Sequence, residues 1–288
     1  MLPEGFTERY VELTDVRLHV VTGGEGPPVL LIAGWPQTWY AWRLVMPELA
    51  RHRQVVAVDT RGVGLSSKPH TGYDTGTLAR DMVELMDALG HERFAVVGHD
   101  IGMWIGYALA ADHPERIERL AVAEAAVPGL TPSPGLFESP RLWHFGFNRL
   151  PELNEVLVRG REEEFFGYQF TAKATQPLPE QAIQVYVDAL KDPDALRASF
   201  EFYRALDTTI EQNTRRKQTR LTLPVLTIAG ANSLNDAVER TMRLAADDVR
   251  AMVLPDCGHY PAEEQPELMV KALIDFLASS YRSETMSA

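Results

Sequence analysis

Short, continuously apolar runs alternate along the chain with longer segments of helical periodicity. Apolar runs of this length are typical of strands that are buried on both faces of a parallel sheet. The run at 29–33 predicts such a strand and 54–59 the next buried one, and we predict further strands at 94–97, 117–124, 224–229 and 249–254. Residues 10–21 alternate instead between apolar and polar positions before a Gly/Pro-rich turn, which predicts an opening hairpin.

Helical periodicity fills most of the gaps between these strands. It predicts helices over 38–50, over 77–89, from the turn near residue 100 through Ala110, and over 266–279. A second helical region follows a Pro/Gly-rich linker at 127–135. Its pattern is almost entirely helical over 143–206, with separate helices at 151–159, 161–170, 179–190 and 194–206.

The order of these elements predicts the fold class. Strands that alternate with helices predict an α/β fold with a doubly wound, mostly parallel sheet. The helical region predicts an inserted all-helical cap over the carboxyl edge of that sheet, where open α/β folds bind their ligands. We therefore divide the chain into a core formed by 1–127 and 219–288, with a polar tail, and a cap with its linkers at 128–218.

Composition narrows the function classes. The net charge of −12 over 288 residues argues against a surface for nucleic acid or for an anionic membrane. No run reaches the roughly 18 apolar residues of a membrane span, and residues 1–10 lack the pattern of a signal peptide. A single cysteine, Cys257, cannot form an intramolecular disulfide. We expect a cytoplasmic enzyme or binding protein, and a homodimer is compatible with these features.

The most informative local motif is Gly98-His99-Asp100-Ile101-Gly102, between a predicted strand and a predicted helix. Its spacing is that of the G-x-S-x-G nucleophile elbow, in which the glycines let a strained backbone present one side chain above the sheet. In this chain that side chain is a carboxylate, Asp100, in place of serine.

Two more polar residues follow predicted strands and complete a candidate constellation. Glu124 ends the strand at 117–124, and His259 follows the last strand. Because the carboxyl ends of parallel strands share one edge of a sheet, we expect both side chains near Asp100. Asp236, which follows the next-to-last strand, is a second candidate for the acid, and we prefer Glu124.

An aspartate nucleophile restricts the reaction. A serine that attacks an sp3 carbon forms an ether, which water does not readily cleave, whereas a carboxylate forms an ester that water can hydrolyse. Asp100 therefore indicates alkyl transfer from an epoxide or from a carbon–halogen bond. Histidine, aspartate and glutamate never cluster at zinc-ligand spacing in the sequence, so we expect no metal.

The order nucleophile, acid, histidine resembles that of the α/β-hydrolases, and the resemblance extends from the turn at 33–36 to the closing helix. It implies an α/β-hydrolase fold in which His259 activates a water molecule and Glu124 orients the imidazole. It also implies an oxyanion hole formed by the backbone N–H groups of Trp35 and Ile101.

Within this fold, the segments 142–147 and 198–205 resemble the cap of the bacterial Cif-type epoxide hydrolases. The resemblance implies a cofactor-independent enzyme whose small-molecule epoxide is held through its oxygen by His144 and Tyr203. It further implies a substrate pocket lined by Trp35, Pro36, Trp39, Trp104 and Phe145. Ala33 departs from the pattern, because the family usually has histidine at that position.

Two alternatives stay open at this point. A haloalkane or haloacid dehalogenase would use the same Asp100, although haloalkane dehalogenases place tryptophan, and fluoroacetate dehalogenases arginine, where this chain has Ile101. Fluoroacetate dehalogenases also carry a His-Trp pair in the cap, where this chain has His144 and Phe145. The other alternative is a binding protein of the same fold that holds a ligand without converting it.

Overall fold

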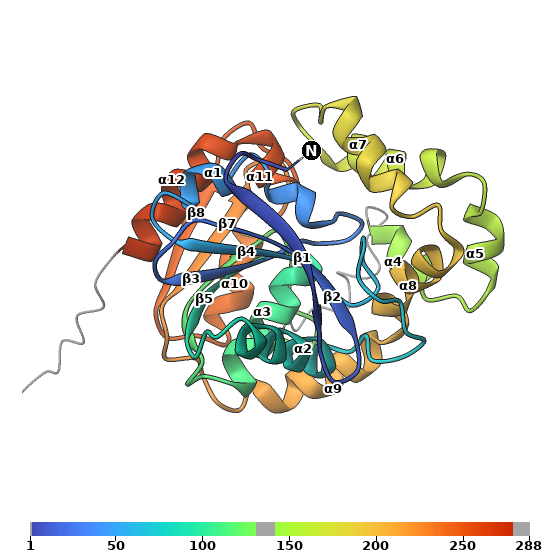
Figure 1. Ribbon diagram of the computed structural model, residues 1–288. Helices are drawn as coiled ribbons and strands as arrows, with labels where there is room; N and C mark the ends of the chain where they lie inside the picture. Colours follow the sequence, from blue (N-terminus) through green and yellow to red (C-terminus); the bar gives the residue numbers. More distant parts are fainter. Residues whose placement is uncertain (1, 131–141, 279–288) are drawn as a thin grey trace, which may run out of the picture.

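An eight-stranded sheet runs through the molecule, with helices on both of its faces (Figure 1). The computed structural model describes residues 2–130 and 142–278. Along the sheet the strand order is β1-β2-β4-β3-β5-β6-β7-β8. The strands are β1 (Phe6–Glu12), β2 (Arg17–Gly23), β3 (Pro28–Ile32), β4 (Gln54–Asp59), β5 (Phe94–His99), β6 (Ile117–Ala123), β7 (Val225–Gly230) and β8 (Val249–Leu254).

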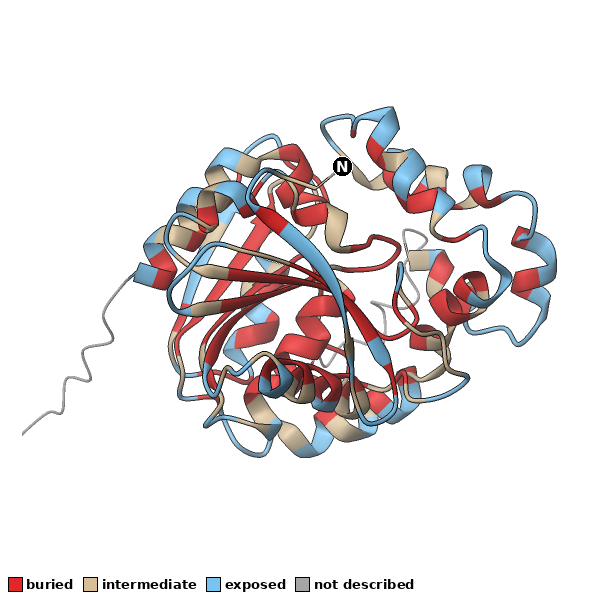
Figure 2. Cartoon of the chain, in the orientation of Figure 1, coloured by how far each residue is buried: buried red, intermediate tan, exposed pale blue. Residues whose placement is uncertain are grey.

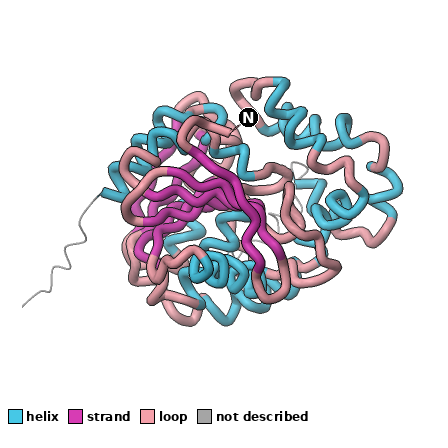
Figure 3. The backbone as a smooth tube through the Cα atoms, viewed as in Figure 1, coloured by secondary structure: helices cyan, strands magenta, loops and turns pink. Residues whose placement is uncertain are grey.

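The sheet is mostly parallel, as predicted. The opening hairpin pairs β1 with β2, with Phe6 opposite Gly23, and β2 continues antiparallel against β4. From β4 onward every pairing is parallel, so the carboxyl ends of β3 and β5 to β8 lie along one edge. Figure 3 shows the strands as one twisted layer.

The core lies on both faces of this sheet, and the inner strands β3 to β7 are its most buried part, whereas the edge strands β1 and β8 are largely exposed (Figure 2). Side chains alternate between the faces along a strand. In β3, Leu30 and Ile32 join one apolar cluster, while Val29 and Leu31 join the cluster on the other face. This two-sided burial explains why the strands appear in the sequence as continuous apolar runs.

The helices fall into two groups. Those that flank the sheet are η1 (Trp39–Trp42), α1 (Met46–Leu49), α2 (Thr75–Ala88), α3 (Ile101–Asp112), α10 (Ala237–Arg243), α11 (Pro261–Glu264) and α12 (Pro266–Ala278). Those between β6 and β7 are α4 (Trp143–Asn148), α5 (Leu153–Val158), α6 (Glu162–Lys173), α7 (Glu180–Asp188), α8 (Pro193–Arg204) and α9 (Leu206–Arg216). Helices α4 to α8 lie beside the sheet, on the right of Figure 1.

The predicted helix over 38–50 is wrong. A 3-10 turn, η1, and a single helical turn, α1, occupy this stretch instead. Pro47 lies in the first turn of α1, where its missing N–H is tolerated, and in the middle of a longer helix it would remove a hydrogen bond. A helix can therefore begin here but does not run through from residue 38.

Helix α9 was not predicted, because two of its three buried residues are polar. Thr209 and Asn213 are both buried. The Thr209 hydroxyl accepts a hydrogen bond from the Thr75 backbone N–H at 3.3 Å, and the Asn213 amide donates to the Pro128 carbonyl at 2.9 Å. These bonds fasten α9 to the core helix α2 and to the chain that leaves β6.

Some predictions fall partly outside the described residues. They are the linker beyond residue 130, the last residue of the closing helix and the polar tail. The cap limits at 128 and 218 stay a prediction, and α9, inside those limits, packs against α2 and α3 of the core. In the described ranges no helix has both the length and the apolar character needed to cross a membrane.

Gly102 gives a test of how closely α3 packs on the sheet. A Cβ added there would lie 2.2 Å from the Ile32 carbonyl oxygen of β3, a distance that no packed structure accommodates without a backbone shift. We expect Gly102→Ala to lower the free energy of unfolding by about 1–3 kcal/mol, measured by urea denaturation.

The matched control is Gly167→Ala in α6, where an added Cβ would meet nothing within 4 Å. Alanine is the better helix former by up to about 1 kcal/mol, so this variant should be neutral or stabilised. Equal unfolding midpoints for the two variants would contradict the close packing of α3 on β3.

Candidate active site

Asp100 lies in the sharp turn between β5 and α3, with φ 53° and ψ −117°. Such a backbone costs about 1–3 kcal/mol for a residue other than glycine and persists only where the surroundings enforce it. The neighbouring glycines make the turn possible: a Cβ on Gly98 would lie 2.2 Å from the Gly102 carbonyl oxygen, and one on Gly34 2.3 Å from the Asp100 Cβ. The elbow therefore needs glycine at positions 34, 98 and 102. Gly98 and Gly102 flank Asp100 in the sequence, whereas Gly34 comes from the distant turn after β3.

Backbone groups fix the carboxylate of Asp100. The Trp35 N–H donates to Asp100 Oδ1 at 3.1 Å, so this predicted oxyanion-hole donor faces the Asp100 carboxylate. Ile101, the second predicted donor, begins α3, and the N–H groups of a first helical turn have no partner within their own helix. Both predicted donors therefore lie beside Asp100.

Glu124 and His259 meet Asp100 as predicted from their positions after β6 and β8. His259 Nδ1 lies 3.1 Å from Glu124 Oε2, and His259 Nε2 lies 3.5 Å from Asp100 Oδ2. Glu124 is almost fully buried and also accepts hydrogen bonds from the Gly230 N–H at 2.7 Å and the Ser233 hydroxyl at 2.6 Å. The alternative acid, Asp236, is exposed and pairs with Arg240 at 2.7 Å.

The charges in this constellation stabilise one another. Burial alone would raise the pKa of Asp100, but His259 outweighs it and holds that pKa well below its usual range. Burial alone would lower the pKa of His259, but the Asp100 and Glu124 carboxylates raise it. At neutral pH Asp100 is thus a carboxylate, beside an imidazole with increased affinity for a proton.

The loop that carries His259 is held by groups that the sequence did not indicate. The Glu264 carboxylate accepts backbone N–H groups of Gly258 at 2.8 Å and Tyr260 at 2.9 Å on either side of His259. It also accepts the N–H groups of Thr175 and Gln176, at the end of α6, at 2.7 and 2.9 Å. One buried carboxylate thus joins the histidine loop to the cap.

Two further contacts position His259. His99 Nε2 and the His259 carbonyl oxygen are 2.7 Å apart, and burial lowers the pKa of His99 to about 4, so the neutral ring donates this bond. The His259 N–H donates to the Lys173 carbonyl at 3.0 Å. A Cβ on Gly258 would lie 2.5 Å from that same carbonyl oxygen, which explains the glycine before the histidine.

His144 and Tyr203 approach the site from the cap. The His144 ring stacks on Trp35, with ring centroids 5.5 Å apart, and the Tyr203 ring packs edge-on against both, at 5.3 Å from Trp35 and 5.9 Å from His144. Burial, then the charge of Lys173, lowers the pKa of His144 to about 3. Burial, then the charge of Asp100, raises the pKa of Tyr203 well above its usual value. Both side chains are therefore neutral at pH 7.

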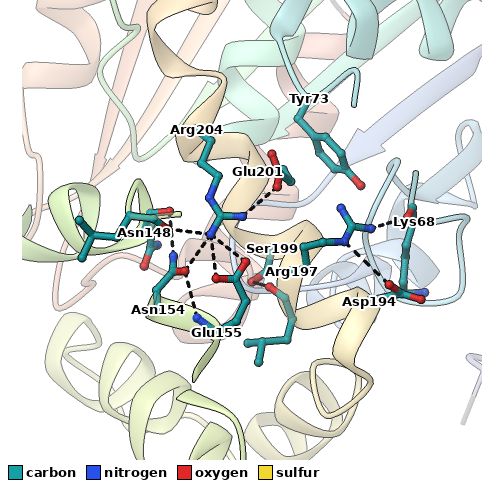
Figure 4. Close-up of polar contacts among 12 residues, drawn as sticks. Lys68, Tyr73, Asn148, Asn154, Glu155, Asp194, Arg197, Ser199, Glu201 and Arg204 are labelled. Atoms are coloured by element: carbon teal, nitrogen blue, oxygen red, sulfur yellow. Dashed lines mark hydrogen bonds and ion pairs between the residues drawn. The ribbon is translucent and has the colours of Figure 1, made fainter. Parts of the chain in front are cut away.

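The helices that carry this pair are fastened together by Arg204, the last residue of α8 (Figure 4). Its guanidinium donates to Glu201 Oε1 at 2.8 Å within α8, and to Glu155 Oε2 at 2.8 Å and Asn154 Oδ1 at 2.7 Å on α5. The Asn154 amide in turn donates to the Asn148 carbonyl, at the end of α4, at 3.1 Å. Tyr203 on α8 and His144 on α4 are thus linked through one arginine.

A cavity of about 510 Å³ lies over Asp100, which is the size of a small-molecule site. Asp100, Glu124, His259, His144 and Lys173 are among its lining residues, as are Trp104 and Phe145 of the predicted pocket. Trp35 and Pro36 line a neighbouring void of about 30 Å³.

One predicted pocket residue, Trp39, lies outside both of these spaces. Trp39 packs against Tyr40 and donates its N–H to Asp59 Oδ1 at 2.8 Å, and it lines neither space. Within residues 2–130 and 142–278, no group of three or more His, Cys, Asp or Glu side chains is arranged to hold a metal ion.

A family model, described as the alpha/beta hydrolase fold, matches residues 27–266. The chain belongs to the α/β-hydrolase fold family. This membership confirms the predicted fold class and establishes the protein as a hydrolase. The sheet order, the elbow at Asp100 and the helices between β6 and β7 are the parts of the fold that form its site.

Similar α/β-hydrolases span nearly the whole chain. A soluble epoxide hydrolase from Corynebacterium sp. (strain C12) is 30% identical over 283 residues, which cover 94% of this chain and 97% of the relative. A fluoroacetate dehalogenase from Burkholderia sp. is 31% identical over 300 residues, which cover 96% and 95%. The crystal structure of wild-type Cfl2 from Burkholderia cenocepacia has a TM-score of 0.91 and 35% identity, covering 94% of this chain and 96% of that one.

The contact between Glu124 and His259 predicts a measurable pKa change. Because the Glu124 carboxylate favours the imidazolium form, Glu124→Gln should lower the pKa of His259, followed by its ring-proton resonances in NMR. Asp236→Asn removes an equally charged carboxylate from an exposed ion pair and should leave that pKa unchanged. A larger shift in the Asp236 variant would make Asp236 the acid that acts on His259.

Proposed function

We propose that this α/β-hydrolase converts an epoxide to a vicinal diol through a covalent ester on Asp100. The observation that carries the proposal is the carboxylate at the elbow, with the Trp35 N–H at 3.1 Å on one side and His259 at 3.5 Å on the other. The neutral His144 and Tyr203 in the cap supply the second half of the chemistry. The proposal requires no cofactor and no metal.

In the first step, Asp100 attacks one carbon of the epoxide, and the C–O bond of that carbon breaks. The electron pair passes to the epoxide oxygen, which needs proton donors as it becomes an alkoxide. We assign this role to His144 and Tyr203, whose rings pack against each other and against Trp35. Neutral side chains suit it, because each then has a proton to donate.

In the second step, His259 removes a proton from water, and the resulting hydroxide attacks the acyl carbon of the Asp100 ester. The acyl C–O bond to the diol oxygen then breaks, and this oxygen takes the proton from the His259 imidazolium, which releases the diol and frees Asp100. The N–H groups of Trp35 and Ile101 hold the oxyanion, and Glu124 stabilises the imidazolium. In the free enzyme the negative charge of Asp100 raises the pKa of His259. Ester formation has by then removed that charge. His259 is thus more readily neutral at the stage that needs a base.

The dehalogenase alternative keeps one specific observation. The Trp35 Nε1–H is buried without a hydrogen-bond partner among the described residues, and such a group could donate to a departing halide. Similarity to a fluoroacetate dehalogenase points the same way. Against it, Ile101 follows the nucleophile and Phe145 follows His144, so a second halide donor is missing from both positions. A binding protein of the same fold is the remaining alternative.

We place the reaction in the cytoplasm, as the acidic chain with its single buried cysteine suggests. The cavity of about 510 Å³ fits a small epoxide. The similarity to a soluble epoxide hydrolase supports the same substrate class.

The decisive experiment is intact-mass analysis of the His259→Gln variant after exposure to a panel of epoxides that includes styrene oxide. Loss of the base should stop the second step, so an adduct of protein plus epoxide should accumulate on Asp100. A second variant that also carries Asp100→Ala should form no adduct and serves as the control for stray alkylation.

Each alternative predicts a different set of results for the native enzyme and its variants. Bromide release from short bromoalkanes by the native enzyme, without diol formation from any epoxide, would favour the dehalogenase. Tight ligand binding without an adduct in any variant would favour the binding protein. Either outcome would contradict the proposed reaction.

A further inference from the structure

Lys173, the last residue of α6, extends its ammonium group toward the cavity over Asp100. Its Nζ lies 3.4 Å from His144 Nε2 and 5.7 Å from the ring centroid of Trp35. Among the described residues, His144 is its only side-chain hydrogen-bond partner. Lys173 thus lines the cavity without a carboxylate partner among the described residues, and shielding a cation from water is costly unless it is paired.

The contact between Lys173 and His144 fixes a tautomer. A protonated lysine has only donors, so His144 Nε2 must accept, and the proton of the neutral imidazole must lie on Nδ1. Nδ1 is buried and has no hydrogen-bond partner among the described residues. An unsatisfied buried donor costs about 1–3 kcal/mol, and a ligand whose acceptor oxygen displaces the packing around Nδ1 would recover this.

We propose that Lys173 positions His144 as the Nδ1–H tautomer and supplies, through it, the proton that the opening epoxide takes up. This inference rests on the proposed epoxide hydrolysis and assigns the source of one proton within it. His144 touches the epoxide oxygen, and Lys173 acts through His144.

The protons gained and lost in this transfer balance over the full reaction. As the epoxide C–O bond breaks, its electron pair takes the proton from His144 Nδ1, and His144 Nε2 takes a proton from Lys173 Nζ. This leaves a hydroxyl group, a neutral imidazole protonated on Nε2, and a neutral amine. When the ester is hydrolysed, Asp100 returns to the carboxylate and releases one proton, which equals the proton that Lys173 gave up. Tautomer exchange of His144 then restores the resting state.

Electrostatics favours this direction of transfer. Burial lowers the pKa of Lys173 to about 8 although the charge of Asp100 opposes the shift. The lysine is therefore a stronger acid than an exposed one while remaining mostly protonated at pH 7. Asp100, His144 and His259 are the titratable groups that interact with it. Because the negative charge moves from Asp100 to the alkoxide, the lysine remains next to a negative charge until it gives up its proton.

The test measures the rate of adduct formation in the His259→Gln protein, by rapid quench and intact mass with styrene oxide from pH 6 to 10. With Lys173 present, the rate should fall as the pH rises through about 8. Adding Lys173→Met should lower the rate at pH 7 by about 100-fold, the usual scale of general acid catalysis, and should remove this pH dependence.

Two further variants separate the roles of charge and proton. Lys173→Arg keeps a donor for His144 Nε2 but cannot lose its proton below pH 12, so it should react at an intermediate rate without the step near pH 8. Lys191→Met replaces an exposed cap lysine and should match the parent. Equal rates and equal pH profiles with and without Lys173 would overturn the inference while leaving the Asp100 ester intact.

A measurement on the His259→Gln protein alone avoids the question of whether the Lys173 variants fold. The ¹⁵N shifts of the His144 ring should show the proton on Nδ1, and a proton on Nε2 would contradict the inference. Failure of every variant, including His259→Gln itself, to form an adduct would instead contradict the proposed function.

Discussion

The negative charge of Asp100, which is largely but not fully shielded from solvent, is the constraint on which the site depends. A carboxylate removed from water costs several kcal/mol unless its surroundings replace the lost hydration. Here the replacements come from three parts of the chain: the Trp35 N–H, the imidazole of His259, and the more distant Lys173 ammonium. His259 in turn requires Glu124, whose own burial is compensated by two further hydrogen bonds from the β7 end and the loop after it. The same contacts that make the charge tolerable also keep the carboxylate ionised.

The same arrangement joins the cap to the loop that carries His259. The backbone at the end of α6 bonds directly to His259, and Glu264 binds N–H groups from both the cap and the histidine loop. A loosened cap would therefore disturb the position of the imidazole as well as the shape of the cavity. Arg204 extends the same coupling outward, because it fastens the helix of Tyr203 to the segment that follows His144.

Sequence reasoning identified the parts of the site that follow from backbone geometry. Gly98 and Gly102 are required by the turn itself, and Glu124 and His259 follow strands whose ends must share an edge, so their spacing was informative. Lys173 and Glu264 gave no such signal. A lysine in the last turn of a helix ordinarily complements the helix dipole, and a glutamate near a helix start does the same at the other end. Their roles depend on how the cap docks, which is a long-range contact that local pattern does not encode. Helix α9 was missed for a related reason, since beyond Leu206 its buried side chains, Thr209 and Asn213, are polar and bond to residues outside the helix.

The Lys173–His144 contact also bears on the choice between the two alkyl-transfer reactions. A departing halide needs positive potential and N–H donors but takes up no proton, and a cation placed directly against it would serve best. In this site the Lys173 ammonium lies 3.4 Å from a neutral imidazole and both side chains line the cavity, so their contact provides a path for a proton. Such a path is of little use to a halide and of direct use to an alkoxide, whose conjugate acid is far weaker. The contact between these two side chains, rather than the presence of positive charge alone, therefore favours the epoxide.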